Sequence, residues 1–108
     1  MMKYLYLLIG MMLLSGIEAV AQDRKVRSYD RSGNGQYKQE HYQEAEMDYR
    51  RALSINPQDS VARFNLATAL IRQQDQAKLA EADSLLTGLI MEAERTPGFA
   101  ATALRLKS

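Results

Sequence analysis

The chain has 108 residues, which fits one small domain or a few repeats of a larger architecture and leaves no room for a large catalytic core. Fourteen basic and thirteen acidic side chains nearly cancel, so net charge gives no support for a nucleic-acid groove or binding to an anionic membrane. The absence of cysteine excludes disulfides, thiol catalysis, thiolate metal sites and a lipid-modified cysteine anchor.

The N-terminus has the three parts of a secretory signal peptide. Lys3 precedes an apolar run over residues 4–14, and a small-x-small cleavage sequence ends at Ala21. Glu18 interrupts the apolar stretch before it reaches the about 20 residues that a membrane-spanning helix needs. We therefore expect residues 1–21 to be removed and the mature chain to be exported to the periplasm. An uncleaved N-terminal anchor is the alternative.

The rest of the chain has the periodicity of successive helices and few strand signals. Four helices are predicted, followed by a short fifth one. The four run over about residues 24–39, 42–55, 61–73 and 77–94. Asn56-Pro57 ends the second, because the residue before a proline disfavours helical backbone. Asp59 or Ser60 is expected to cap the third.

Two glycines, Gly33 and Gly35, lie inside the first predicted helix. Each costs about 1 kcal/mol relative to alanine at such a position. We therefore expect each of them to admit a neighbouring backbone.

Small and aromatic residues recur in the order of one known helix-turn-helix repeat. That repeat is about 34 residues long and requires aromatic residues, small residues and a proline at fixed places. When the chain is aligned to it at a single register, these places are filled by residues of the required kind. These places are occupied by Tyr29, Gly33, Tyr37, Ala45, Tyr49, Ala52 and Pro57. The stretch "GNGQYKQEHYQEAEMDYRRALSINPQD" thus resembles a tetratricopeptide unit over nearly its whole length. The resemblance implies an all-α fold, an α-solenoid of tetratricopeptide-like repeats with about two units and the start of a third.

A second unit is expected to begin at Ser60, with Leu66 and Ala67 as its packing pair. Its second helix matches only after an insertion of about three residues in "DQAKLAEA", which leaves the register of that helix open. The repeat domain then covers residues 22–95, with units over about 26–59 and 60–95.

Residues 96–108 follow as a short C-terminal helix or a truncated third unit. Their apolar side chains need a cover, because a terminal repeat requires a polar outer face. Either this segment folds back over the fourth helix, or the chain is truncated, or a partner covers it.

A narrower resemblance extends from the N-terminus of the mature chain to about Leu70. "R-K" before the first unit, "G-N-x-x-Y" and "A-E-x-x-Y-R-x-A-L" resemble the exported tetratricopeptide proteins of the Bacteroidetes aerotolerance operons, called Bat proteins. That resemblance implies partnership with other envelope proteins of such an operon.

In tetratricopeptide proteins the first helices of the units line a groove that binds polypeptides. Carried over place by place, the partner-binding groove is lined by Arg27, Asp30, Arg31, Asn34, Tyr37, Lys38, Val61, Phe64, Asn65, Thr68, Ile71 and Arg72. The alternative for each polar residue is a solvated helix face. For Phe64 and Ile71 the alternatives are packing against a third unit or an anchor pocket.

Some family members hold a peptide's C-terminal carboxylate in a clamp. Asn34 and Asn65 match two places of that clamp, but Asp30 stands where the clamp needs a lysine. A carboxylate there would repel the ligand carboxylate, so this mode of capture is rejected.

The remaining polar residues give no sign of chemistry. Glu44, Glu46 and Asp48 are expected on a solvated helix face with two arginines close by. His41 is the only histidine and has no companion at catalytic or metal-ligand spacing. We therefore expect no enzyme, no metal, no cofactor, no small-molecule substrate and no nucleic-acid partner.

Two functions remain. The first is an exported protein–protein interaction module, a scaffold or adaptor in a cell-envelope complex, with a link to aerotolerance. The second is a structural subunit that forms a homo-oligomer through its exposed repeat end, because about three units are usually needed for independent stability.

Overall fold

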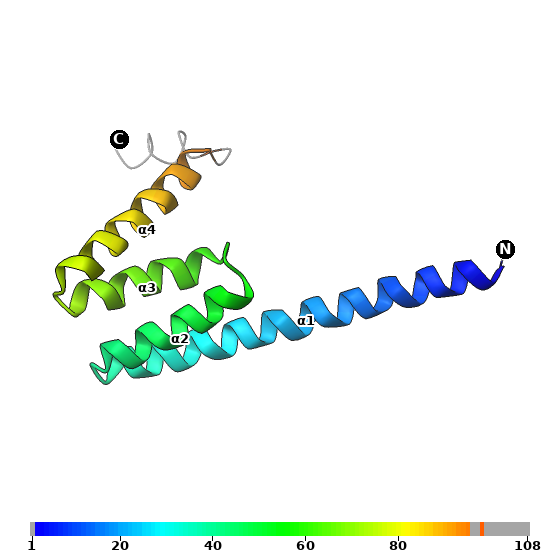
Figure 1. Cartoon of the computed structure of the whole chain (residues 1–108), viewed down its shortest axis with the longest axis horizontal. Coiled ribbons are helices and arrows are strands. Elements are labelled where there is room, and N and C mark those ends of the chain that lie inside the picture. The colour runs from blue at the N-terminus through cyan, green and yellow to red at the C-terminus, as the bar shows by residue number, and fades with distance from the viewer. Residues whose placement is uncertain (1, 96–97, 99–108) are drawn as a thin grey trace.

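The structure, a computed structural model, describes the backbone of residues 2–95 and 98, and the side chains of residues 4–9, 19–95 and 98. It contains α1 (Met2–Lys38), α2 (Tyr42–Ile55), α3 (Ser60–Arg72) and α4 (Gln76–Arg95) (Figure 1). No strand occurs in this part of the chain. The short fifth helix that the sequence predicts lies outside the described residues.

Helix α1 is longer than predicted. It runs without interruption from Met2, whereas the sequence predicts a start near residue 24. No proline interrupts this span, and its leucine, methionine and alanine content favours helix, so nothing local ends the helix at the expected boundary. In Figure 1 the first half of α1 extends beyond the other helices. The described side chains there, from Tyr4 to Ile9, are exposed.

The other helix boundaries agree with the predictions to within one residue or two. Asp59 caps α3, since its side chain accepts a hydrogen bond from the backbone N–H of Val61 at 3.1 Å. Asp75 does the same for Ala77 at the start of α4. Each helix packs on the next one, and α1 also contacts α3. Helices α1 and α3, which are the first helices of the two predicted units, therefore lie next to each other.

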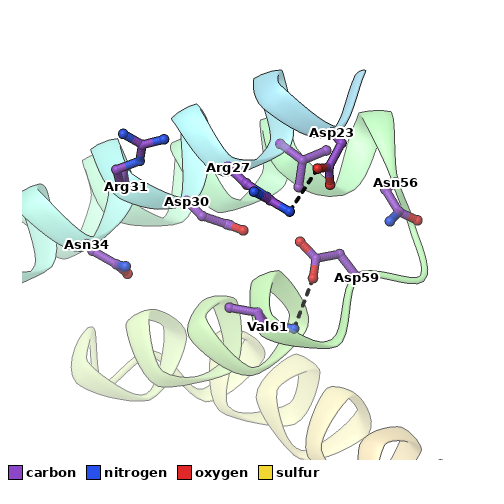
Figure 2. A pocket seen from close by; sticks show the side chains of 9 residues that line it. Asp23, Arg27, Asp30, Arg31, Asn34, Asn56, Asp59 and Val61 are labelled. Carbon is purple, nitrogen blue, oxygen red and sulfur yellow. Dashed lines mark hydrogen bonds and ion pairs between the residues drawn. The ribbon is translucent and has the colours of Figure 1, made fainter. Parts of the chain in front are cut away.

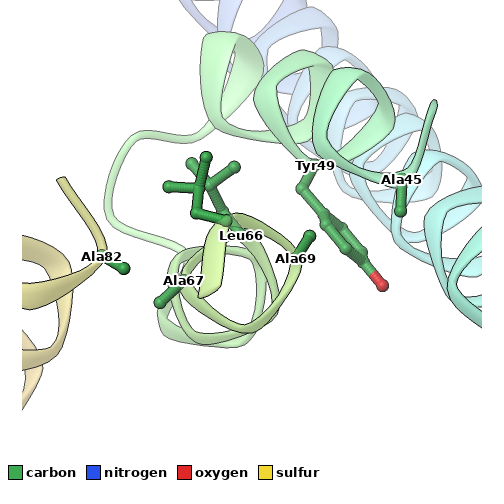
Figure 3. Close-up of a cluster of buried hydrophobic side chains, with 7 residues drawn as sticks. Ala45, Tyr49, Leu66, Ala67, Ala69 and Ala82 are labelled. Carbon is green, nitrogen blue, oxygen red and sulfur yellow. The ribbon is translucent and has the colours of Figure 1, made fainter. Parts of the chain in front are cut away.

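The core lies between the helices and is built from unusually small residues. The main cluster, shown in Figure 3, consists of Ala45, Tyr49, Leu66, Ala67, Ala69, Leu70 and Ala82. A second cluster joins Val26 of α1 to Ala52 of α2 and Ala62 of α3. Alanine at these positions lets the helix axes approach closely, and Tyr49 is the largest almost fully buried side chain among the described residues.

The expected roles of the two α1 glycines need correction. A Cβ atom at Gly33 would lie 2.5 Å from Cε1 of Tyr49, so Gly33 makes room for a side-chain ring and not for a backbone. Apart from the local backbone of α1 and the two chain neighbours, no atom lies within 4 Å of the position that a Cβ would take at Gly35, so that prediction is wrong. The close approach depends on which side of α1 faces α2, and spacing alone does not reveal that side.

Asp48 also departs from the expectation of a solvated face. Its side chain is buried and accepts a hydrogen bond from Ser32 Oγ at 2.7 Å and one from Arg51 at 3.0 Å. Glu46 is half-buried and accepts hydrogen bonds from Arg50 and Gln73. Of the three acidic residues, Glu44 alone is exposed.

Candidate partner-binding groove

The predicted groove residues are divided between the exposed surface and the interface of α1 with α3. Most are exposed, namely Arg27, Arg31, Asn34, Lys38, Val61, Phe64, Ile71 and Arg72. The half-buried ones are Asp30, Tyr37, Asn65 and Thr68. We call the surface formed by Asp30 and Asn34 of α1 with Val61, Phe64 and Asn65 of α3 the α1–α3 surface.

Three apolar side chains of α3 are exposed on the side away from the core. Val61 is 57% exposed, Phe64 53% and Ile71 40%. Their spacings of three and seven residues place them on one stripe of the helix. The buried residues of α3, such as Leu66 and Leu70, occupy the other stripe. The helix therefore has two apolar faces, one of which no described residue covers.

Asparagines connect the two helices beside this stripe. The Tyr49 hydroxyl donates to Asn34 Oδ1 at 2.6 Å, and Asn65 Nδ2 lies 3.5 Å from the same oxygen. Burial, followed by the charge of Asp30, raises the pKa of Tyr49 to about 12, so the hydroxyl keeps its proton as a donor. Asn34 is thus held in place from within the core.

Two aromatic rings meet where the C-terminal end of α1 joins the start of α2. The Tyr37 and Tyr42 rings meet edge to face at 5.2 Å between centroids, and the Arg72 guanidinium lies 5.4 Å from the centre of the Tyr42 ring. Tyr37 also packs against the main core cluster. Tyr37 therefore has a structural role besides its predicted place in the groove.

A pocket of about 390 Å³ opens between the middle of α1 and the start of α3 (Figure 2). It is lined by Asp23, Val26, Arg27, Asp30, Arg31, Asn34, Asn56, Asp59 and Val61. In Figure 2 the side chains of Asp30 and Asp59 point toward each other across it, whereas Arg31 points away. Arg27 is engaged with Asp23 in an exposed ion pair at 3.0 Å.

The electrostatics of the pocket are governed by two facing carboxyl groups. Burial, and then the neighbouring Asp59 carboxylate, raise the pKa of Asp30 from 3.8 to about 6. The Asp30 Oδ1 atom is buried and receives no hydrogen bond within the described part of the chain. The Asp59 carboxylate that faces it can only accept hydrogen bonds. It can donate one to Asp30 only if one of the two carboxyls is protonated.

The sequence did not single out Asp23, Val26, Asn56 and Asp59 as site residues. The sequence predicts Asp59 or Ser60 as the helix cap, and that position explains the place of Asp59 at the pocket: a cap stands at the start of α3, where α3 meets α1. Asn56 lies in the α2–α3 turn, so neither residue belongs to the first helices from which the groove was inferred.

The described residues contain neither a cluster suited to a metal ion nor a helix suited to a membrane. Among the described residues no group of histidine, cysteine, aspartate and glutamate side chains could hold a metal ion. Within the same part of the chain, no helix has the length and apolar character needed to cross a membrane.

Comparison with known protein families supports the repeat assignment. A family model described as tetratricopeptide repeat matches residues 48–83, from the second half of α2 through α3 into α4. No curated protein and no solved structure matches the chain. Together with the stacked helices, the match confirms an all-α, tetratricopeptide-like solenoid and supports the tetratricopeptide family. Repeats of this family generally mediate protein–protein interaction and carry no catalytic activity of their own.

Proposed function

We propose that this chain is an exported protein–protein interaction module, a scaffold or adaptor in a cell-envelope complex, which binds a polypeptide segment on the α1–α3 surface. The observation that carries the proposal is the exposed apolar stripe of Val61, Phe64 and Ile71. This stripe lies on the helix that also borders the pocket, so apolar and polar recognition elements adjoin. A partner segment would find apolar anchors and fixed polar groups on one surface.

The export and the aerotolerance link rest on sequence features. The charged residue, apolar run and cleavage sequence support export, and the motifs shared with Bat proteins support a role beside other envelope proteins. N-terminal sequencing of the protein from its own host tests the first point. A chain starting at Gln22 in the exported fraction is expected, and an intact N-terminus in the membrane fraction would favour the anchored alternative.

Affinity capture from an envelope extract tests the interaction itself. Phe64→Ala removes the central apolar anchor, and Met47→Ala on α2 is a matched control, because Phe64 is 53% and Met47 54% exposed. We expect the partner to be retained by the control and lost by Phe64→Ala. Equal capture by both variants would move the site away from α3.

A structural self-assembling subunit is the second candidate, and one observation favours it. Ala82 is the only fully buried residue of α4, whereas Ile90 is 59% and Met91 48% exposed. An apolar helix face that no described residue covers is suited to pairing with a second copy. Light scattering of the wild-type chain and an Ile90→Glu variant distinguishes the two: a wild-type monomer favours the adaptor, and a dimer lost on substitution favours self-assembly.

A further inference from the structure

The pocket between α1 and the start of α3 contains an acceptor, Asp30 Oδ1, that no donor of the described structure satisfies while both facing carboxyls are ionised. A buried carboxylate oxygen without a donor is costly, because its hydration is lost without replacement. Asp30 Oδ1 is in this position, and the side chain points at a second acceptor, Asp59. The second carboxyl cannot turn away freely, since its Oδ1 is the cap acceptor for Val61 N–H.

Neither arginine that lines the pocket reaches the two carboxyls. Arg27 lines the pocket but forms its ion pair with Asp23, one helical turn before it. Arg31 lines the same pocket, and its side chain points away from the two carboxyls in Figure 2. The charged residues that line the pocket are thus Asp23, Arg27, Asp30, Arg31 and Asp59. Arg63, on the first turn of α3, also interacts with the Asp59 charge, but its guanidinium pairs with Glu92 at 2.6 Å.

An external cation would relieve this arrangement. An ammonium or guanidinium group carries several N–H donors and no acceptor, so it can donate to both carboxylates at once. The pocket volume of about 390 Å³ leaves room for such a side chain. Its wall also includes Val26 and Val61, which suit the aliphatic stem of a lysine or arginine.

We propose that the Asp30–Asp59 pair receives a lysine or arginine side chain of the partner segment, while an apolar neighbour of that residue packs on Val61 and Phe64. This inference rests on the proposed function and names the chemistry of the partner. The surface thus selects a segment with a basic residue beside an apolar one. The charge of this ligand is opposite to that of a C-terminal carboxylate. The pairing of a desolvated carboxylate with a cation provides the specificity, and the apolar stripe provides contact area.

The test uses the full chain and a library of random linear peptides blocked at both ends. Peptides selected by the wild type are remade with each lysine replaced by norleucine and each arginine by citrulline, and affinities are measured by calorimetry. Asp30→Asn removes one carboxylate with little change in shape. Asp59→Asn removes the other and keeps a good helix cap, because asparagine caps as well as aspartate. Asp83→Asn, at an exposed position of α4, is the control for net charge.

The expected result is enrichment of peptides with a basic residue next to an apolar one. We expect Asp30→Asn, Asp59→Asn and the neutral peptides each to weaken binding by about tenfold or more, with Asp83→Asn unchanged. Circular dichroism and thermal melting confirm that every variant is folded. Enrichment of peptides without basic residues, or equal affinity for Asp30→Asn, would overturn this inference and leave the binding surface intact. Failure of the wild-type chain to enrich any peptide would contradict the proposed function as well.

Discussion

The Tyr49 ring occupies the space that a side chain at Gly33 would need. A Cβ atom at position 33 would lie 2.5, 2.8 and 2.9 Å from three ring carbons, closer than real contacts allow. The ring cannot move aside easily, because it is almost fully buried and its hydroxyl is bonded to Asn34. The first unit therefore depends on this contact between α1 and α2.

Gly33→Ala should lower stability although alanine favours helix. Overpacking costs about 1–3 kcal/mol, which exceeds the gain of up to about 1 kcal/mol in helix propensity. Gly35→Ala is the matched control: it lies in the same helix, and no other helix comes within 4 Å of the position of its Cβ, so it should stabilise by up to about 1 kcal/mol. Urea unfolding measures both. A stabilised Gly33→Ala variant would contradict the packing described here.

Ala45→Leu should overpack the main core cluster. Ala45 has no exposed surface and shares that cluster with Tyr49, Leu66 and Leu70. Added methylene groups in a closely packed core cost about 1–3 kcal/mol, so the melting temperature should fall by several degrees. Met47→Leu, two residues away and exposed, should melt like the wild type. Unchanged melting of Ala45→Leu would undo the repeat assignment of α2.

Asp48→Ala should destabilise the α1–α2 contact. The buried carboxylate accepts hydrogen bonds from Ser32 and Arg51, and its loss leaves the Ser32 hydroxyl without that acceptor. A cost of about 1–3 kcal/mol is expected. Glu44→Ala, at an exposed position of the same helix, should change stability by less than about 0.5 kcal/mol. Equal unfolding midpoints for the two variants would show that the buried carboxylate contributes nothing.

Ala45, Tyr49 and Ala52 could be located from the sequence, but Asp48 and the pocket could not. Ala45, Tyr49 and Ala52 recur at intervals of three and four on one helix, so their common face follows from local geometry. Ser32, the partner of Asp48, lies 16 residues earlier on another helix, and no local pattern indicates such a pair. The Asp30–Asp59 pair likewise joins α1 to the cap of α3 and depends on how the helices stack.

Stability should rise as the pH falls from about 7 to about 5. Burial and Asp59 raise the pKa of Asp30 from 3.8 to about 6, so the folded chain binds a proton in a range where the unfolded chain does not. The gain at pH 5 is about 1 kcal/mol, because solvent screening reduces the effect for a half-buried group. Below about pH 5 the stability should fall again, because Glu46 has a lowered pKa and its contribution is lost when it is protonated. Burial alone would raise its pKa, but hydrogen bonds from Gln73, Arg50 and Lys78 hold the pKa below 4.5.

Thermal melting between pH 7 and pH 4 checks this prediction. In the Asp30→Asn variant the rise toward pH 5 should disappear, and its stability at pH 7 should exceed that of the wild type. A His41→Asn variant should keep the rise in stability. That result would show that the rise does not depend on the only histidine. A rise of equal size in Asp30→Asn would assign the effect to another group.

Site-specific photocrosslinking in the protein's own host tests the central claim most directly. A photoreactive phenylalanine analogue replaces Phe64 on α3 or, as control, the equally exposed Met47 on α2. We predict that irradiation links a second polypeptide to position 64 and not to position 47. An adduct at position 47 alone, or at neither position, would contradict binding on the α1–α3 surface.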